Sequence, residues 1–482
     1  MILRPYQLAD LAGIRALFAK GHQRVLHVLP TSGGKTQEFA EMVRLAHGRN
    51  MNTVILVGRD SLLTQASQKL KAIGVKHGII APGHNFYGDT VHVASINTLV
   101  RRLDKFDFNF IVVDESHHAT SPTYAKIFAS YPKAKVLGVT ATPIRGDGRG
   151  LDSVFQAMHL GPSIKDLIDD GYITEPDTYG PKKMLDLSRV RNVAGDYDKK
   201  QLSDAMDDPH IVGDAIEHYA AICPGVPAVV FAINIKKAED AAIAFRAAGF
   251  RSESIHGKMP LALIRQRIAA LASGAVQILA TCDLVSEGLD LPAIVCAINL
   301  RPTKSVGLHI QQAGRALRPM YAFGFDLRTR EGRLAAIAAG PKPRAIILDH
   351  AANCFRHMTV DEPRTWTLAG RKRRGGKSGP TMSLTQCPAC LRPHKPSPKC
   401  PHIKPDGTPC GHIYTGQPRE LNEVAGTLEK VDKVALRRAQ WGEEHSCKTL
   451  DELVELGKAR KYRYAKLWAE RRWQFIKPRV RA

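Results

Sequence analysis

Long apolar runs are missing from this chain of 482 residues: no stretch of 18 or more apolar residues occurs in it. A transmembrane helix needs such a stretch, so we expect no membrane-spanning segment. The opening decapeptide, MILRPYQLAD, also lacks the charged, apolar and cleavage segments of a secretory signal. These two absences predict a cytoplasmic protein.

Acidic residues are in short supply. The chain has 46 Asp and Glu against 69 Lys and Arg, which gives a formal net charge of +23. From residue 371 to the end, 25 basic residues stand against 11 acidic ones, so much of the excess lies in the tail. This surplus favours a polyanionic partner such as nucleic acid, although charge alone does not separate nucleic acid from an anionic membrane surface.

The rest of the composition is that of a globular protein. Hydrophobic residues at 44% and charged residues at 24% argue against a disordered or fibrous chain, and the length predicts two or three domains. Short apolar runs alternate with alanine-rich helical stretches, which predicts βαβ units and parallel sheets. The runs that we interpret as buried strands are 54–57, 110–113, 136–139, 229–233, 278–280 and 294–298.

Two such series follow one another, separated by a segment rich in Gly, Pro and Asp. We therefore predict an α/β fold of two tandem parallel-sheet lobes, followed by a small cysteine-rich element and a helical basic tail. The predicted boundaries are 1–145 for the first lobe, 146–209 for a crossover, 210–368 for the second lobe, 369–382 for a flexible basic linker, 383–415 for the cysteine-rich element and 416–482 for the tail.

The stretch VLHVLPTSGGKT, residues 25–36, predicts a phosphate site. A buried strand leads into a turn and then a helix, so backbone N–H groups can surround a phosphate. Lys35 can reach the outer phosphates and the Thr36 hydroxyl can ligate Mg²⁺. Leu29 replaces the first glycine of the general P-loop pattern, so this fragment alone is also compatible with a glycine-rich turn that carries a surface lysine.

A second stretch, FIVVDESHH, supplies two carboxylates at the end of a buried strand. Ligand sites of α/β sheets form at this carboxyl edge. We expect Asp114 to hold Mg²⁺ and Glu115 to orient or deprotonate an attacking water. A solvated acidic turn is the alternative.

With these two motifs together, the chain resembles a superfamily 2 helicase or translocase of the DEAD/DEAH-box type, with DESH in place of DEAH. The resemblance covers residues 2 to about 357 and implies two RecA-like lobes with ATP bound between them. The matching motifs are RPYQ at 4–7, PTSGGKT at 30–36, VTATP at 139–143, ATCDLVSEGLDLP at 280–292 and QQAGRALRP at 311–319.

The resemblance implies a role for individual residues. Arg318 is expected to be the arginine finger with Arg315 beside it, and His117 to link the ATP site to the VTATP motif or to the arginine motif; a metal site at His117 and His118 is the alternative that we do not favour. The implied catalytic residues are Lys35, Asp114, Glu115, Gln311, Arg315 and Arg318. The implied ATP-binding residues are Arg4, Gln7, Thr31, Gly33, Gly34, Lys35, Thr36 and Asp290, and the coupling residues are His117, Thr140 and Thr142.

Contacts to a nucleic-acid backbone are implied for Arg59, Ser95, Thr98 and Thr281. The first three are equally compatible with a surface cation or strand-end caps, and Asp290 with a helix cap or turn residue. Beyond the arginine motif, a D-x-x-x-N-x-x-R-H pattern is formed by Asp349, Asn353, Arg356 and His357. It resembles the corresponding stretch of RadD-like bacterial and phage helicases, relatives of the XPB-like group, though a capped strand with polar ends explains it too.

Four of the nine cysteines lie within 24 residues, which indicates metal more than disulfides in a reducing compartment. A C-x₂-C pair places two thiolates on one ion, and tetrahedral Zn²⁺ needs two more ligands. We predict a structural zinc site made by Cys387, Cys390, Cys400 and Cys410. The second pair departs from C-x₂-C, which leaves His394, His402 and His412 as rival ligands.

The last predicted helix interleaves Tyr462, Tyr464, Trp468 and Trp473 with Lys and Arg. Such a pattern suits base stacking with phosphate binding, and it equally suits a packing face or a helix that docks a protein. Together these features predict an ATP-driven translocase or helicase with ATP, Mg²⁺ and Zn²⁺ as cofactors, acting on single-stranded or forked DNA in bacterial or phage repair, recombination or replication. An RNA helicase, the motor of a restriction system and a non-hydrolysing adaptor are the alternatives.

Overall fold

The computed structural model describes the chain except for residues 1–2, 59, 85–88, 146–147, 182–186, 188–189, 194, 207–208, 283–293, 371–384, 388, 391, 395–396, 405–406, 414–443, 445–446, 448, 460–464 and 477–482. Four residues singled out above lie outside the described part: Arg59, Asp290, Tyr462 and Tyr464. Most of the predicted linker and the start of the tail lie outside it as well. The chain divides into two compact units, 1–415 and 416–482, which are described separately.

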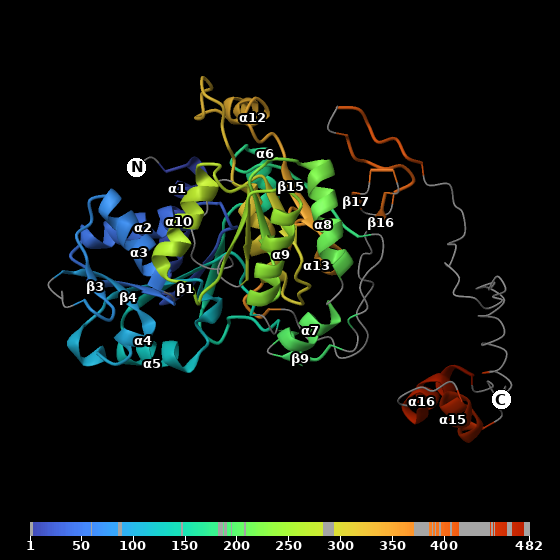
Figure 1. Cartoon of the computed structure of the whole chain (residues 1–482). Helices are drawn as coiled ribbons and strands as arrows, with labels where there is room; N and C mark the ends of the chain where they lie inside the picture. Colours follow the sequence, from blue (N-terminus) through green and yellow to red (C-terminus); the bar gives the residue numbers. More distant parts are fainter. Residues whose placement is uncertain are drawn as a thin grey trace. The chain divides into compact units, whose positions relative to one another are not determined.

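The first unit begins with a seven-stranded sheet in the order β3-β4-β2-β5-β6-β1-β7, in which every neighbouring pair is parallel (Figure 1). Its strands are β1 (Arg24–Val28), β2 (Thr53–Val57), β3 (Gly78–Ile80), β4 (Val91–Ser95), β5 (Phe110–Asp114), β6 (Lys135–Thr140) and β7 (Ala157–Leu160). The accompanying helices are α1 (Pro5–Ala19), α2 (Lys35–His47), α3 (Asp60–Ala72), α4 (Ile96–Leu99) and α5 (Pro122–Ser130), with the short 3₁₀ turns η1 (Leu103–Lys105) and η2 (Ser116–His118).

Strand β2 shows why these apolar runs form a buried sheet. Successive side chains point to opposite faces, so Ile55 and Val57 enter one hydrophobic cluster while Val54 and Leu56 enter the other. All four are at most 1% exposed. A strand covered by helices on both faces needs apolar residues at every position, which explains a continuous run in place of an alternating one.

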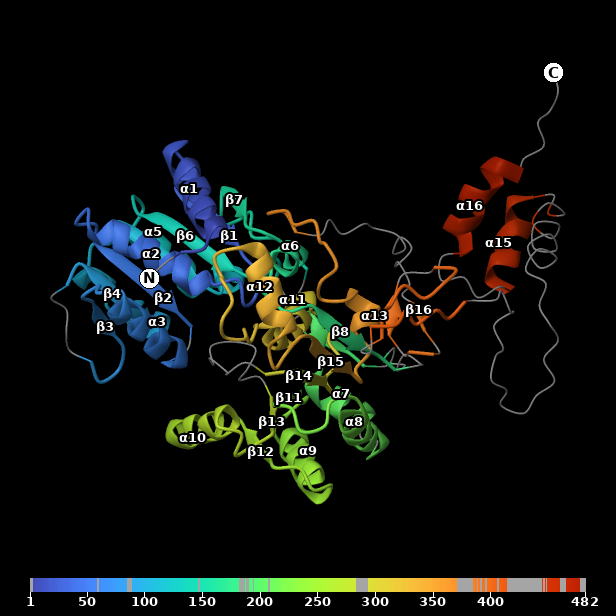
Figure 2. The same ribbon diagram turned by 90° about the horizontal axis from the view of Figure 1, so that it is seen from above.

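The second sheet has six strands in the order β12-β13-β11-β14-β15-β8, again with parallel neighbours (Figure 2). Its strands are β8 (Pro176–Tyr179), β11 (Ala228–Phe231), β12 (Ser252–Ile255), β13 (Ile278–Thr281), β14 (Cys296–Asn299) and β15 (Ala345–Asp349). Its helices are α8 (Pro209–Ile222), α9 (Ile235–Ala247), α10 (Leu261–Ala272), α11 (Val306–Gly314), α12 (Arg330–Ala338) and α13 (Asn353–His357), and the 3₁₀ turn η3 (Arg315–Leu317) continues α11. The predicted fold of two parallel α/β sheets is confirmed.

The segment expected to be a crossover, 146–209, contains regular strands and helices among its described residues. It contributes β7 to the edge of the first sheet and β8 to the edge of the second. Between them α6 (Ile164–Asp169) buries Leu167 and Ile168 in the core of the second lobe. A two-stranded hairpin, β9 (Asn192–Val193) with β10 (Asp196–Tyr197), and α7 (Lys199–Ala205) follow.

The cysteine-rich element contains a small antiparallel ladder, β16 (Thr385–Gln386) with β17 (Pro393–His394). In the second unit, α15 (Leu450–Ala459) and α16 (Ala465–Ile476) bury Leu453 and Ala469 completely among the side chains that the structure describes there. Of the aromatic residues named for the last predicted helix, Trp468 and Trp473 lie in α16, and Tyr462 and Tyr464 lie outside the described residues. No helix in the described part of the chain is long and apolar enough to cross a membrane.

Candidate active site

The phosphate-binding turn lies between β1 and α2. Gly34 begins the helix with φ of +90°, a left-handed conformation that favours glycine, and a Cβ there would lie 2.6 Å from Nε2 of Gln7. Lys35 and Thr36 form the first turn of α2. Leu29, at the position of the missing glycine, extends the strand by donating its N–H to the carbonyl of Thr140, and its side chain packs beneath Gly33. The leucine that replaces the glycine of the general pattern thus packs against the turn.

The N-terminal RPYQ motif is bound directly to this turn. The Tyr6 hydroxyl donates to the carbonyl of Gly33 at 2.6 Å, and Arg4 donates to the Tyr6 hydroxyl at 2.9 Å. Gln7 is fully buried and donates to the carbonyl of Gly34 at 3.4 Å. Burial raises the pKa of Tyr6 to about 12, so this hydroxyl stays a donor. Tyr6 was missed from the sequence, although it stands between two residues that were expected to bind nucleotide.

The two carboxylates lie at the carboxyl end of β5. Asp114 is the last residue of the strand, and Glu115 follows with φ of +48° and donates its N–H to Oδ1 of Asp114 at 2.9 Å. Burial raises the pKa of Asp114 to about 6; the Glu115 carboxylate adds to the rise and Lys35 opposes it. Lys35 is thus close enough to act on the carboxylate of Asp114. Oxygen donors such as this carboxylate and the Thr36 hydroxyl are the ligands that Mg²⁺ prefers.

A chain of polar contacts leads from Glu115 to the VTATP motif. Nδ1 of His117 lies 3.4 Å from Oε2 of Glu115 and 3.5 Å from Oγ1 of Thr140. Oγ1 of Thr140 in turn donates to the carbonyl of Thr142 at 3.0 Å. The ring centroids of His117 and His118 lie 4.1 Å apart, because the 3₁₀ turn η2 brings these adjacent side chains together.

Helix α11 of the second lobe lies against the phosphate-binding loop of the first. Oγ of Ser32 donates to the carbonyl of Gly314 at 3.2 Å, and a Cβ on Gly314 would lie 2.9 Å from Cβ of Thr31. At the other end of the helix, a Cβ on Gly307 would lie 2.8 Å from Oγ1 of Thr142. Both ends of the helix therefore contact loops of the first lobe at the ATP-site motifs.

The residues of the arginine motif extend from this contact. Gln311 is buried on α11, Arg315 follows Gly314 directly, and Arg318 follows the 3₁₀ turn η3 as its C-cap. The fully buried Lys342 donates from Nζ to the carbonyls of Arg318 at 2.7 Å and of Ile294 at 2.5 Å. Burial lowers the pKa of Lys342 to about 7, with Arg318 adding to the effect. Nothing in the sequence GPKPR around Lys342 singled it out as support for the arginine motif.

The residues expected to contact nucleic acid lie on several separate elements. Ser95 ends β4 and Thr98 lies in α4, both half-buried. Thr281 ends β13 and is fully buried, so in this conformation its side chain is not available to a strand. Arg59 and Asp290 lie outside the described residues, and all of these roles stay predictions.

The four clustered cysteines come together as a group that can hold zinc. Their sulfur atoms all lie within 4.8 Å of one another, with Cys387 and Cys410 at 3.6 Å and Cys390 and Cys400 at 3.7 Å. A tetrahedron with Zn–S bonds of about 2.3 Å has edges of about 3.8 Å, so these separations fit the ion. Burial opposes ionisation of Cys387, but the N–H groups of Cys390 and Ala389 prevail and lower its pKa to about 6.

The rival histidines are not part of the sulfur cluster among the described residues. Nε2 of His402 donates to the carbonyl of Pro393 at 3.2 Å. The element is attached to the second lobe by Arg392, whose Nη2 lies 2.8 Å from Oδ2 of Asp177 on β8. Both side chains of this ion pair are 6% exposed.

Two family models match the chain at these sites. Residues 1–145 match the res subunit of type III restriction enzymes, and residues 215–320 match the helicase conserved C-terminal domain. The chain belongs to the superfamily 2 helicases. A member of this ATP-dependent family is an ATPase, and the first match contains the phosphate-binding turn and both carboxylates while the second contains the arginine motif.

Similar proteins come from viruses and cells. A 51.5 kDa protein of Lactococcus phage (isolate 7-9) is 27% identical over 435 residues, 89% of this superfamily 2 helicase and 87% of the relative. IRC3 of Saccharomyces cerevisiae (strain ATCC 204508 / S288c), provisionally designated an ATP-dependent helicase, is 28% identical over 66% of this chain and 49% of its own length. The chain thus spans about half of that relative.

Two further comparisons are more limited. The DNA 3'-5' translocase XPB2 of Sulfurisphaera tokodaii is 30% identical over 130 residues, 26% of this chain and 29% of the relative. A fragment provisionally assigned as the HsdR subunit of a type I restriction enzyme from Vibrio vulnificus YJ016 has a similar structure, with a TM-score of 0.54, 17% identity and coverage of 73% of this chain and 65% of its own. This likeness concerns the fold alone. The RadD-like subgroup stays a prediction.

Proposed function

We propose that this chain is an ATP-driven translocase or helicase that acts on DNA and hydrolyses ATP between its two lobes. The contact of α11 with the phosphate-binding loop carries the proposal, because Gly314 lies against Thr31 and Ser32 and directly precedes Arg315. An arginine that enters the phosphate site only when the lobes meet makes hydrolysis depend on closure. Loss of the γ-phosphate then releases the lobes, and the cycle becomes motion along a strand.

Each site residue has a proposed part in this cycle. The backbone of the turn and Lys35 hold the phosphates, while Thr36 and Asp114 hold Mg²⁺, which supplies Lewis-acid stabilisation of the phosphate oxygens. Glu115 orients the attacking water, and Arg318, with Arg315 beside it, stabilises the charge that develops on the transferred phosphoryl group. The contacts Glu115 to His117 to Thr140 to Thr142 lead toward Gly307, which gives a physical route between hydrolysis and the second lobe.

The net charge of +23 suits a polyphosphate, whether DNA or RNA. DNA is favoured as the track because one relative is named as a DNA translocase. Repair, recombination or replication in a bacterium or phage is the proposed setting, consistent with a phage relative that covers 89% of the chain. Zinc in the four-cysteine element would be structural, because a site closed by four thiolates leaves no open position for catalysis.

The test is steady-state ATP hydrolysis without nucleic acid and with single-stranded DNA, forked DNA or RNA. We expect DNA to stimulate hydrolysis, and Glu115→Gln to lower kcat by at least ~100-fold with DNA binding intact, since the water loses its orienting carboxylate. Stimulation by RNA instead of DNA would identify an RNA helicase. Wild-type turnover in Glu115→Gln would contradict the proposed site, and binding of DNA without any stimulation would indicate an adaptor or a motor that needs a partner, such as a restriction complex.

A further inference from the structure

The loop that joins β14 to α11, residues 300–305, decides where the arginine-bearing helix begins. Its last residue, Ser305, caps α11 by accepting the N–H of Leu308 at 3.2 Å and donates its own N–H to Oγ1 of Thr303 at 3.0 Å. Thr303 is fully buried. A shift of this loop would therefore displace the first turn of α11, and Gly307 in that turn contacts Thr142 of the other lobe.

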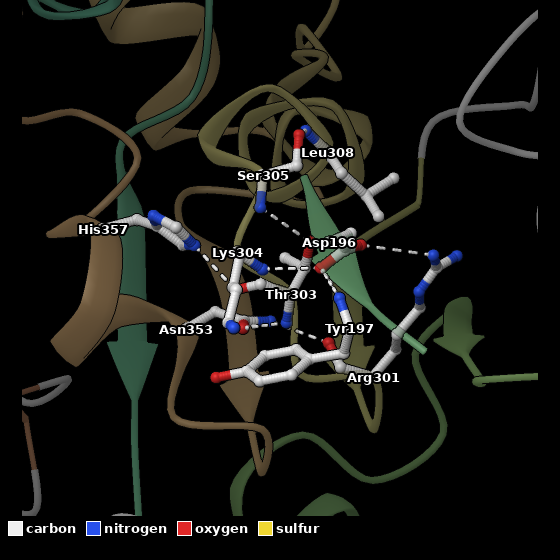
Figure 3. Close-up of polar contacts among 9 residues, drawn as sticks. All are labelled: Asp196, Tyr197, Arg301, Thr303, Lys304, Ser305, Leu308, Asn353 and His357. Carbon is white, nitrogen blue, oxygen red and sulfur yellow. Dashed lines mark hydrogen bonds and ion pairs between the residues drawn. The ribbon is translucent and has the colours of Figure 1, made fainter. Parts of the chain in front are cut away.

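Two residues of α13 hold one side of this loop (Figure 3). The side-chain amide of Asn353 accepts the N–H of Thr303 at 3.0 Å and donates to the carbonyl of Arg301 at 2.9 Å. His357 lies with Nε2 2.8 Å from the carbonyl of Thr303. Through these contacts, two members of the D-x-x-x-N-x-x-R-H pattern position the loop before the arginine helix.

The hairpin from the segment between the lobes holds the other side. The Asp196 carboxylate accepts from the Thr303 hydroxyl at 2.9 Å, from the Lys304 N–H at 2.7 Å and from Nη2 of Arg301 at 3.5 Å. Tyr197 adds an aromatic contact, with Nζ of Lys304 4.6 Å from its ring centroid. One carboxylate thus binds three polar positions of the loop, and Figure 3 shows it pointing directly at them.

The hairpin is itself anchored to the second lobe. Tyr197 shares a small hydrophobic cluster with Leu202 of α7 and with Ile233, which follows β11. Nδ2 of Asn234, the N-cap of α9, donates to Oγ of Ser203 at 2.9 Å. Asp196 is therefore fixed against the body of the lobe and can restrain the loop.

We propose that Asp196 is a positioning residue for ATP hydrolysis: by fixing residues 301–305 it sets the position of α11 and hence of Arg315 and Arg318 at the phosphate site. The inference rests on the proposed role of these arginines. Asp196 does not contact the phosphate-binding turn in the described part of the structure, so it should influence the hydrolytic step through α11 and leave nucleotide binding by the first lobe unchanged. A misplacement of about 1 Å at a catalytic group can cost ~100-fold in rate.

The matched control lies two residues away. Asp198 caps α7 by accepting the N–H of Gln201 at 2.9 Å and takes no part in the contacts to residues 301–305 described here. Asp198→Ala removes a carboxylate from the same hairpin region and lowers the melting temperature, but should leave kcat at the wild-type value. Thr303→Val removes the hydroxyl that donates to Asp196 and also accepts the N–H of Ser305, while it keeps the side-chain shape.

The experiment measures DNA-stimulated ATP hydrolysis by the full chain. We expect Asp196→Ala and Thr303→Val each to lower kcat at least tenfold with KM for ATP within twofold of wild type, and the double variant to lose less than the product of the two single losses. Combined with Arg318→Ala, in single-turnover measurements, Asp196→Ala should add less than the loss that it causes alone, because part of that loss acts through Arg318.

Three results would overturn the inference: wild-type kcat in both Asp196→Ala and Thr303→Val, a loss of rate that Asp198→Ala shows equally, or a multiplicative loss with Arg318→Ala. Lys35→Ala and Arg318→Ala show whether such a result contradicts the positioning role alone or the proposed function as well. If these two variants hydrolyse ATP normally, the proposed site is wrong; if they are inactive and Asp196→Ala is not impaired, only the positioning role is.

Discussion

A buried polar cluster beneath the phosphate-binding turn shows how burial sets protonation. Nε2 of His27 on β1 lies 2.5 Å from Oε2 of Glu38 on α2, and Nε2 of His159 lies 2.9 Å from Oδ1 of Asp10. Burial raises the pKa of Glu38 to about 9 and lowers that of His27 to about 4. At neutral pH a protonated Glu38 therefore donates to a neutral His27. Ligand atoms of Asp10, His27 and Glu38 lie within 4.8 Å of one another, but a carboxyl that keeps its proton favours this hydrogen bond over a metal ion.

Glu38→Gln tests this protonation state. Glutamine donates to His27 as the protonated acid does, so we expect the two proteins to match in stability below about pH 4.5, where Glu38 is protonated in both the folded and the unfolded chain. The folded protein keeps the Glu38 proton up to a pKa of about 9, whereas the unfolded chain releases it near the ordinary glutamate pKa of 4.5, so wild type loses stability as pH rises between these values. From pH 6.5 to 9 the variant should gain roughly 3 kcal/mol relative to wild type in denaturant unfolding. An equal pH dependence of the two proteins would show that Glu38 is ionised in the folded state.

At the scale of elements, the central strands were predictable and the edges were not. The central runs, such as Val54 to Val57, are apolar at every position because both faces are covered. The edge strands β7 (AMHL) and β8 (PDTY) carry polar residues and gave no strand signal. The phosphate-binding turn and the carboxylates were visible because their chemistry needs fixed residue types, while Lys342 and Asp196 act through contacts between segments 24 and about 107 residues apart.

Removal of zinc should unfold the cysteine-rich element and leave the two lobes folded. We expect one zinc per chain, and chelation should open residues 385–413 to protease because so short a segment cannot bury a core. The melting temperature of the lobes should change little, because Asp177 keeps Arg344 as a partner, with Nη2 at 2.5 Å, when Arg392 is released. Cys400→Ser should lower zinc content and Cys447→Ser, outside the cluster, should not. Full zinc content in Cys400→Ser would reject the four-cysteine site.

At the scale of the whole molecule, the distribution of charge predicts a salt dependence. Of the 25 basic residues after position 370, nine lie in 371–415 and 16 in 416–482. If the tail binds phosphates, a chain that ends at residue 370 should show a shallower slope of log affinity against log salt than the full chain, by about 0.7 for each lost contact to single-stranded DNA. A chain that ends at residue 415 separates the zinc element from the tail. Identical slopes in all three would exclude phosphate contacts from both.

The lobes can approach each other at α11 because Gly307 and Gly314 have no side chains. Alanine is the better helix former at both positions, so the helix alone would favour it. Yet a single methyl group would lie 2.8 Å from Oγ1 of Thr142 at position 307, or 2.9 Å from Cβ of Thr31 at position 314. Each methyl would act as a wedge between the lobes although no phosphate-binding or catalytic residue is replaced. Positions 307 and 314 are thus constrained by the space that the opposite lobe must occupy, and not by the helix propensity of α11.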